Sequence, residues 1–468
     1  MKETDAMLGL MGVILLCSIN SFAARPKLPK IDTVNFQPPK GSRHVLDNGL
    51  IIYVLKDNSL GIFHMTAATR TGSIYDAKEK IGLAEMTGWL LKNGGSAKYS
   101  SEEIDKTLEY LGASLETFMD REEARADMFC LKKDFEKAFD IFSDVLINPS
   151  FEDEKIKIKK DEMIEMIRRR NDKPDRQAVR EAMRMFYGPD HPYGWRTEIS
   201  TIEPVTKDDL KAFHRKYYKP NNTIIAVSGD FEDESRLIDT IKAKFLNWKK
   251  EPVEFPPVPP VKIPETRKIY LIDKQISQTF VVMLQKGIKR HDPVEFPLTV
   301  ANEIFGGGIH SRLGNEIRSK RGLAYAVYSY YAKRPDYGFI LGYLGTKPES
   351  TGQAISEMIM QFDLMKKEPV TGEELKRGKD AIINPFVFRF PTPFAIVSER
   401  ALYEHYGYAD DYLDSYVNNI ANTSEKTILD ATGKLFKPES ALIFVIGDSK
   451  KFDKPLSEFG PVTELKED

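Results

Sequence analysis

YKPNNTIIAVSGD at residues 218–230 and FKPESALIFVIGD at residues 436–448 are two copies of one pattern. In each copy a Lys-Pro pair follows a helix-like run and leads into an apolar, β-branched segment that ends in Gly-Asp. Every matched pair of positions is separated by 218 residues. Because chance agreement at six positions with one offset is improbable, the sequence predicts two related halves with a binding cavity at their seam.

Between the two copies lies the best candidate for a domain boundary. Residues 251–264 read EPVEFPPVPPVKIP, and six prolines exclude a helix or a central strand and favour an extended tether. We therefore expect an N-terminal domain at 36–250, a linker at 251–266 and a C-terminal domain at 267–460.

The first half mixes strand and helix patterns. Residues 44–55 predict two strands joined by an Asn48-Gly49 turn, and residues 62–71 a further strand. Apolar periodicity predicts helices over 82–92, 101–111, 133–146 and 153–170, and two strands within 115–131. The fold class is therefore α+β, with two homologous α/β sandwich-like domains that form a clamshell.

Composition excludes several classes of protein. The chain has 468 residues, 41% hydrophobic residues and a net charge of -2, which is typical of a globular protein. Since 68 basic residues nearly balance 70 acidic ones, nothing suggests a nucleic-acid partner. Two cysteines, Cys17 and Cys130, cannot form a disulfide framework, and Cys130 is expected to be a small buried hydrophobe.

The N-terminus has the pattern of a secretory signal. Residues 7–19 are an apolar run too short to span a bilayer comfortably, and small residues follow at 21–24. We expect residues 1–23 to be a signal peptide cleaved near Ala23, which places the protein in an exported compartment. A lipoprotein signal at Cys17 is the alternative, but Leu16 is too bulky for it, and no later stretch has the length of a membrane span.

Five short motifs occur along the chain: Gly82-Leu83-Ala84, Lys92-Asn93-Gly94-Gly95, His191-Pro192-Tyr193-Gly194, Gly306-Gly307-Gly308 with Ser311-Arg312-Leu313, and Arg321-Gly322-Leu323-Ala324-Tyr325. With these motifs in this order, the chain resembles the insulinase/pitrilysin metallopeptidases over about residues 40–450. The resemblance implies an insulinase-like metallopeptidase fold.

The resemblance also implies a zinc helix reading His-x-x-Glu-His, and this chain has lost it. The corresponding positions are Glu85, Gly88 and Trp89, and only Glu165 matches a family ligand. No two of the seven histidines are one helical turn apart, so we expect no metal in this chain. Glu85 and Glu165 together could hold calcium; the simpler interpretations are a salt bridge at Glu85 and a packed helix face at Trp89.

The second half keeps a different part of the family's site. The resemblance implies that Arg318 and Tyr325, seven residues apart, reach across the cavity to the substrate. A guanidinium and a phenol hydroxyl are suitable donors for the oxyanion that forms when water attacks a peptide carbonyl. The alternative is that Arg318 caps its helix and Tyr325 belongs to the core.

Two other features have simple interpretations. Gly306, Gly307 and Gly308 lack the Gly-Lys-Ser/Thr of a phosphate loop, so we expect a turn or a peptide-contacting substrate loop. The basic runs 155–160 and 168–170 are expected to be solvated helix faces, with a patch that steers acidic peptides as the alternative.

The resemblance therefore suggests a periplasmic subunit that has no zinc of its own and forms a heterodimer with a zinc-bearing family member. Arg318 and Tyr325 would complete the partner's site around a bound peptide. The main alternative is a proteolytically inert assembly scaffold on the same fold. A third hypothesis is a self-sufficient hydrolase that uses Glu165 with unrecognised ligands.

Overall fold

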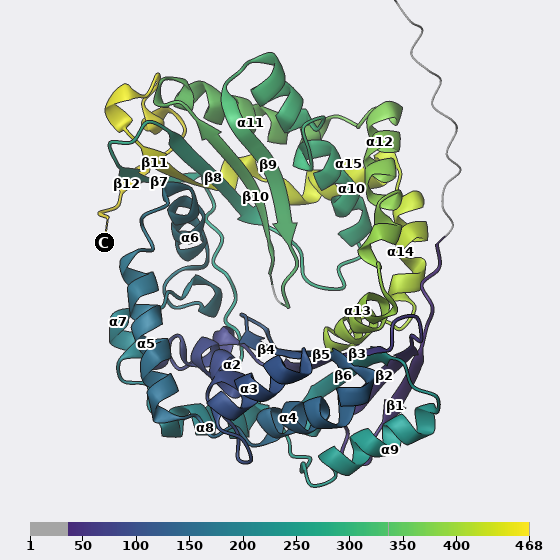
Figure 1. Ribbon diagram of the computed structural model, residues 1–468. Coiled ribbons are helices and arrows are strands. Elements are labelled where there is room, and N and C mark those ends of the chain that lie inside the picture. The colour runs from purple at the N-terminus through teal and green to yellow at the C-terminus, as the bar shows by residue number, and fades with distance from the viewer. Residues whose placement is uncertain (1–35, 336, 468) are drawn as a thin grey trace, which may run out of the picture. The chain divides into compact units, whose positions relative to one another are not determined.

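The computed structural model describes residues 36–335 and 337–467. The expected signal peptide, its cleavage site and Cys17 lie outside the described residues. The described residues from Gln37 onward form one compact unit (Figure 1).

Two six-stranded sheets carry the fold. The first has the order β1-β2-β6-β3-β5-β4 and the second the order β12-β7-β11-β8-β10-β9. The strands β2-β6-β3-β5-β4 of the first sheet and β7-β11-β8-β10-β9 of the second follow the same order, and β6 and β11 contain the repeated motif. The predicted duplication and the α+β fold class are therefore confirmed. The strands are β1 (Ser42–Val45), β2 (Ile51–Lys56), β3 (Ile62–Arg70), β4 (Ser114–Met119), β5 (Glu123–Leu131), β6 (Thr223–Gly229), β7 (Lys268–Asp273), β8 (Thr279–Lys286), β9 (Ala324–Ala332), β10 (Phe339–Thr346), β11 (Leu442–Gly447) and β12 (Val462–Glu464).

Local sequence signals explain the elements of the first half. β1 and β2 pair in antiparallel fashion around a turn in which Gly49 has a φ of 85°, a conformation that glycine adopts without strain. The helix over 101–111 begins with a capping box, in which Ser100 and Glu103 satisfy each other's backbone N–H groups. Cys130 is buried in β5, as expected, and burial raises the pKa of its thiol to about 12.

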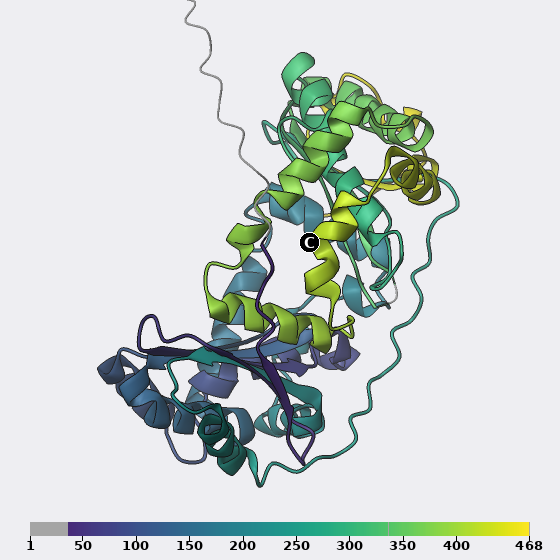
Figure 2. The ribbon, with the colours of Figure 1, turned by 90° about the vertical axis from the view of Figure 1, so that its right-hand side faces the viewer.

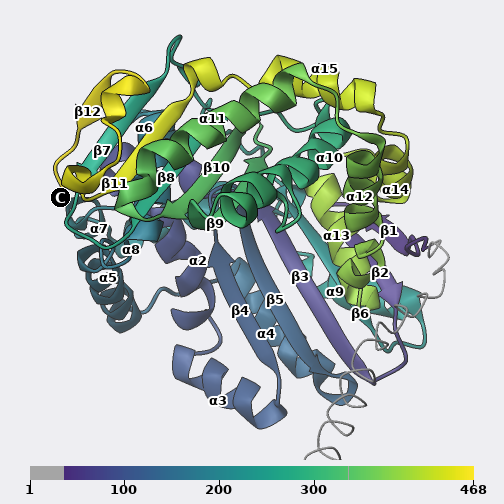
Figure 3. The same ribbon diagram turned by 90° about the horizontal axis from the view of Figure 1, so that it is seen from above.

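One face of each sheet is covered by helices from its own half (Figure 3). In the first half Leu90, Phe139, Leu210 and Ile241 pack with strand residues in one core. The helices of this half are α2 (Leu83–Asn93), α3 (Ser101–Leu111), α4 (Phe135–Ile147), α5 (Asp153–Arg168), α7 (Ile199–Ile202), α8 (Lys207–Tyr217) and α9 (Glu234–Phe245).

The second sheet is covered in the same way. Phe305, Phe362 and Phe436 meet in its core, with the Phe305 and Phe362 ring centroids 4.4 Å apart. The helices are α10 (Glu295–Gly306), α11 (Thr351–Lys367), α12 (Gly372–Ile383), α14 (Tyr412–Ala421) and α15 (Glu425–Leu435).

The opposite face of each sheet is covered by a helix from the other half. α6 (Pro174–Tyr187) lies on the second sheet, where Ala178, Ala182 and Phe186 pack against β8 and β11. α13 (Pro393–His405) lies on the first sheet, where Val397 and Ala401 pack against β2 and β6. Figure 1 shows both helices beside the other half's strands. Because each half completes the other's core, the two halves are not independent packing units.

The proline-rich segment 251–264 contains no helix or strand. In Figure 2 it runs as an extended trace between α9 and β7. No single helix within the described residues has the length and apolar character of a membrane span, although the bent pair Gly372–Arg389 and Pro393–His405 meets these criteria together.

A buried carboxylate joins the two halves at the tips of equivalent hairpins. Glu122, in the β4–β5 turn, accepts hydrogen bonds from Tyr193 Oη at 2.8 Å and from Arg334 Nη1 at 2.7 Å, and it also pairs with Arg290. Arg334 lies in the β9–β10 connection. Glu122 is only 6% exposed, so these contacts are shielded from water. Removal of this carboxylate would leave two guanidinium groups without their partner.

Candidate functional site

α2 carries the degenerate zinc motif, and a buried carboxylate fixes where this helix begins. Both oxygens of Asp76 accept backbone hydrogen bonds, from Gly82 and from Ala84, each at 2.8 Å. Gly82 has a φ of 107°, which glycine tolerates, and this conformation turns the chain into the helix. Burial raises the pKa of Asp76 to about 7.

Gly88 stands at the position where the resembled family has its catalytic glutamate, and the structure leaves no room for a side chain there. A Cβ atom at residue 88 would lie 2.5 Å from the backbone nitrogen of Met119 in β4. α2 therefore lies directly on β4, and the missing glutamate cannot be accommodated in this backbone arrangement.

Lys159 lies between the two positions that correspond to the family's zinc-binding histidines. Its Nζ atom is 3.7 Å from Glu85 Oε1, 5.4 Å from the centre of the Trp89 ring and 3.5 Å from Glu162 Oε2. Lys159 is 5% exposed, whereas Glu85 is about half exposed. An ammonium group held by carboxylates thus stands beside the positions where imidazoles would bind a metal.

Glu165, the surviving ligand position, has arginine partners instead. Its carboxylate is exposed and lies 4.0 Å from both Arg168 and Arg169, on its own helix and just beyond it. Glu85 is thus paired with Lys159, and Glu165 with Arg168 and Arg169. These pairs match the salt-bridge interpretation of Glu85 rather than a calcium site shared by Glu85 and Glu165. In the part of the chain that the structure describes, no group of three His, Cys, Asp or Glu side chains is arranged to hold a metal. These residues do not fit the zinc that the resemblance implies for active members of the family.

The expectation that residues 155–160 form a solvated face is wrong for Lys159. Lys159 follows Ile156 by three residues and precedes Met163 by four, and these three are the buried residues of α5. This helical spacing was present in the sequence and would have identified Lys159 as an inward-facing cation.

Arg318 and Tyr325 lie on one exposed segment of the second half. Arg318 is in the last turn of the helical segment Gly314–Lys320, and Gly322, with a φ of 62°, ends that segment by donating its N–H to the Arg318 carbonyl at 3.1 Å. Tyr325 follows at the start of β9, and both side chains are exposed. Tyr325, which is 45% exposed, is therefore not a core residue.

A β-bulge sets the direction of Tyr325. Ala324 and Ala326 pair with adjacent residues Thr346 and Gly345 of β10, so Tyr325 is the extra residue. Its ring lies over Gly345, where a side chain would collide with it, and its hydroxyl donates to Gln278 Oε1 at 2.9 Å. Burial, together with nearby Asp175 of α6, raises the pKa of Tyr325. The phenol thus remains protonated at neutral pH and can donate a hydrogen bond.

The three glycines at 306–308 have separate roles. A Cβ at Gly306 would lie 2.4 Å from the backbone nitrogen of Ser329, so this glycine allows α10 to pack against β9. A Cβ at Gly307 would collide with Glu303 of the same helix, whereas Gly308 faces open space. Of the three glycines, Gly308 is therefore the one beside which a bound substrate would find space.

Two models of one peptidase family match the chain, and together they span most of it. Residues 68–189 match the insulinase family, peptidase family M16, and residues 204–382 match the peptidase M16 inactive domain. The chain therefore belongs to the insulinase family of peptidases.

Two bacterial proteins are similar to this chain in sequence. The chain is 24% identical to the uncharacterized zinc protease YmxG of Bacillus subtilis, over 86% of this chain and 97% of that protein. It is 26% identical to an uncharacterized zinc protease of Streptomyces coelicolor, over 61% of this chain and only 63% of that protein.

Among solved structures, a peptidase M16 inactive domain from Pseudomonas fluorescens aligns with a TM-score of 0.81 and 25% identity, covering 88% of this chain and 99% of that one. A protease from Helicobacter pylori aligns with a TM-score of 0.79 and 19% identity, covering 87% and 99%.

Proposed function

We propose that this chain is the zinc-lacking subunit of a two-chain peptidase and that it binds peptides together with a zinc-bearing partner. Arg318 and Tyr325 are proposed to complete the partner's active site by donating hydrogen bonds to the peptide carbonyl that is attacked. The observation that carries the proposal is the contrast between the two halves. Lys159 and the close packing at Gly88 block the metal face of α2, whereas the Arg318–Tyr325 segment is exposed.

The geometry suits this role. The guanidinium of Arg318 offers several N–H donors in one plane, and Tyr325 is directed by its bulge and held as a neutral donor. Donors placed before the reaction begins stabilise an oxyanion without reorganising during it, and removal of one such donor costs roughly 100- to 1000-fold in kcat. We also propose, from the N-terminal apolar run in the sequence, that the two-chain peptidase works in the periplasm, and fractionation of cells that express the tagged chain tests this localisation.

The first test measures peptide cleavage by a zinc-bearing family member from the same organism, with and without the purified chain. We expect this chain to raise the cleavage rate, and Arg318→Ala and Tyr325→Phe each to remove most of the gain. Tyr330→Phe is the matched control, because Tyr330 is 54% exposed on the same strand.

The remaining outcomes separate the alternatives. If Tyr325→Phe is as active as Tyr330→Phe, while substitutions elsewhere on the surface abolish complex formation, the chain is an assembly scaffold. If the isolated chain contains stoichiometric zinc and shows chelator-sensitive cleavage, it is a self-sufficient hydrolase and the proposal fails.

A further inference from the structure

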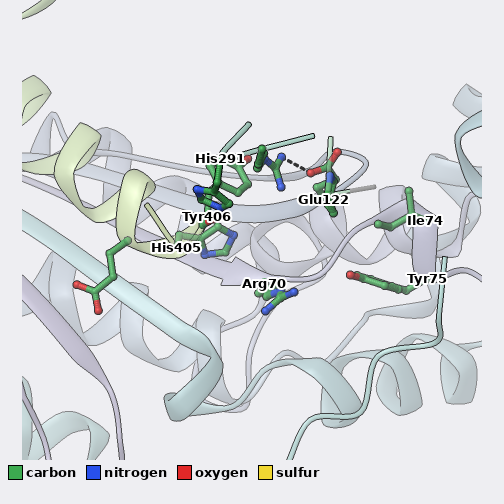
Figure 4. Close-up of a pocket in the computed structure, with 11 residues that line it drawn as sticks. Arg70, Ile74, Tyr75, Glu122, His291, His405 and Tyr406 are labelled. Atoms are coloured by element: carbon green, nitrogen blue, oxygen red, sulfur yellow. Dashed lines mark hydrogen bonds and ion pairs between the residues drawn. The ribbon is translucent and has the colours of Figure 1, made fainter. Parts of the chain in front are cut away.

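A cavity of about 340 Å³ lies where the first sheet meets the end of α13, and nothing described above uses it. It is lined by Arg70 at the end of β3, by Ile74 and Tyr75, by Glu122 and Arg290 of the seam, and by Glu404, His405 and Tyr406 (Figure 4). Its volume falls within the range of pockets that bind small groups.

The two carboxylates of this cavity already have cationic partners. Glu122 pairs with Arg290 and Arg334. Glu404 accepts two hydrogen bonds from Arg43 at 2.7 Å each, and these bonds lower the pKa of Glu404. Neither carboxylate is therefore available to neutralise a further cation.

Arg70 is the cation that remains. Its exposed guanidinium lies over the ring of Phe255, 4.9 Å from the ring centre, and also interacts with Tyr75, but no ion pair with a carboxylate is found for it within residues 36–335 and 337–467. An aromatic face and one phenol stabilise a guanidinium only in part, because a guanidinium has five N–H donors and several of them remain for an anion.

His405 provides a second, independent observation. Its side chain is 2% exposed, and its Nε2 atom has no hydrogen-bond partner among the described residues. The nearest carboxylate oxygen, Glu123 Oε2, is 4.0 Å away, which is too far for a hydrogen bond. Figure 4 shows the ring turned toward Arg70. A buried polar atom without a partner costs about 1–3 kcal/mol, which a bound ligand could offset.

We infer that this cavity binds a single carboxylate group of a peptide, held by Arg70 and by His405 Nε2. One uncompensated guanidinium matches one negative charge. A phosphate would bring nearly two charges close to Glu122 and Glu404, which disfavours it. Tyr75, Tyr406 and Ile74 provide apolar surface for the chain that carries the carboxylate. The inference concerns the isolated protein and does not require a zinc-bearing partner.

Calorimetry on the full chain tests the inference with three peptides of the same length. The first is acetylated and amidated, with one central glutamate; the second has glutamine in its place; the third is the glutamine peptide with a free C-terminal carboxylate. We expect the glutamate peptide or the free-carboxylate peptide to bind at least about tenfold more tightly than the neutral peptide, as a charge-assisted hydrogen bond predicts. Whichever of the two binds identifies a side-chain or a terminal carboxylate as the source.

The variants locate the binding site. Arg70→Gln should reduce the affinity of the acidic peptide to that of the neutral peptide, and Arg70→Lys should retain part of it. Arg236→Gln, an exposed arginine on α9, should change nothing. The inference is overturned if wild-type protein does not distinguish the three peptides, if Arg70→Gln binds the acidic peptide normally, or if inorganic phosphate competes better than acetate.

Discussion

Substitution of Glu122 should weaken the association of the two halves by a predictable amount. In Glu122→Ala, Arg290 and Arg334 lose their shared carboxylate and Tyr193 loses its acceptor. The side chains of both arginines are at least three-quarters buried, so screening by water is limited. Removal of one partner of a buried ion pair costs about 3–5 kcal/mol. Glu122→Gln keeps an acceptor of the same shape and should cost about 1–2 kcal/mol.

Urea denaturation and thermal unfolding measure both variants. With an unfolding entropy of about 2 cal/mol/K per residue, a loss of 4 kcal/mol lowers the Tm of a chain of this size by roughly 4–5 °C. Glu116→Ala is the control, because Glu116 is exposed on the neighbouring strand β4. A double-mutant cycle with Arg334→Ala should give a coupling energy of at least about 1 kcal/mol. The reasoning is refuted if Glu122→Ala is as stable as Glu116→Ala or if the cycle shows no coupling.

Three further predictions concern other parts of the chain. His214 is buried and hydrogen-bonded to the Leu146 carbonyl, and burial lowers its pKa from 6.5 to about 4. The unfolded chain therefore binds a proton that the folded chain excludes. The neutral His214 leaves the free energy of unfolding unchanged above pH 6.5, and below that pH the free energy of unfolding falls by about 1.4 kcal/mol per pH unit until the pH reaches about 4. His214→Gln should flatten urea stability curves by this slope, and parallel curves would contradict the assignment. The triple variant Glu85→His, Gly88→Glu, Trp89→His should bind no stoichiometric zinc by elemental analysis, because the Lys159 ammonium remains beside the new imidazoles. It should also unfold more readily than wild type, because a side chain at position 88 collides with the backbone of β4. A stable zinc-loaded variant would show that α2 can move away from β4. Proteolytic cleavage within residues 251–264 should leave both fragments in one peak on gel filtration, since α6 and α13 each pack on the other half, whereas separate peaks would show that the tether holds the halves together.

Local patterns and the internal repeat accounted for most of the fold. The capping box at Ser100 and the turn at Gly49 act within a few residues, so the sequence alone reveals them. The 218-residue repeat correctly predicted that β6 and β11 occupy equivalent places. The exchange of α6 and α13 was not predicted, because an apolar helix face shows that it is buried but not which sheet covers it.

The candidate site was predictable where one motif defines it and not where distant segments meet. Arg318 and Tyr325 are seven residues apart, so one short motif contains both, and the structure has them at the end of a helical segment and at the start of β9. The bulge that directs Tyr325 depends on pairing with β10 and leaves no local signal. Lys159 was hidden in a basic run although its spacing was informative, and the contacts of Glu122 with Arg290 and Arg334 join residues too distant in sequence to be recognised as partners.

The exchanged helices also constrain the order in which the protein can mature. Synthesis completes α6 long before β8 and β11, so its apolar face, with Ala178 and Phe186, has no sheet to cover it until nearly the whole polypeptide has been made. The reverse holds for the strands β2 and β6, which wait for α13. The nascent first half therefore exposes apolar surface until the second half has been synthesised, and such surface makes an incompletely folded chain prone to aggregate.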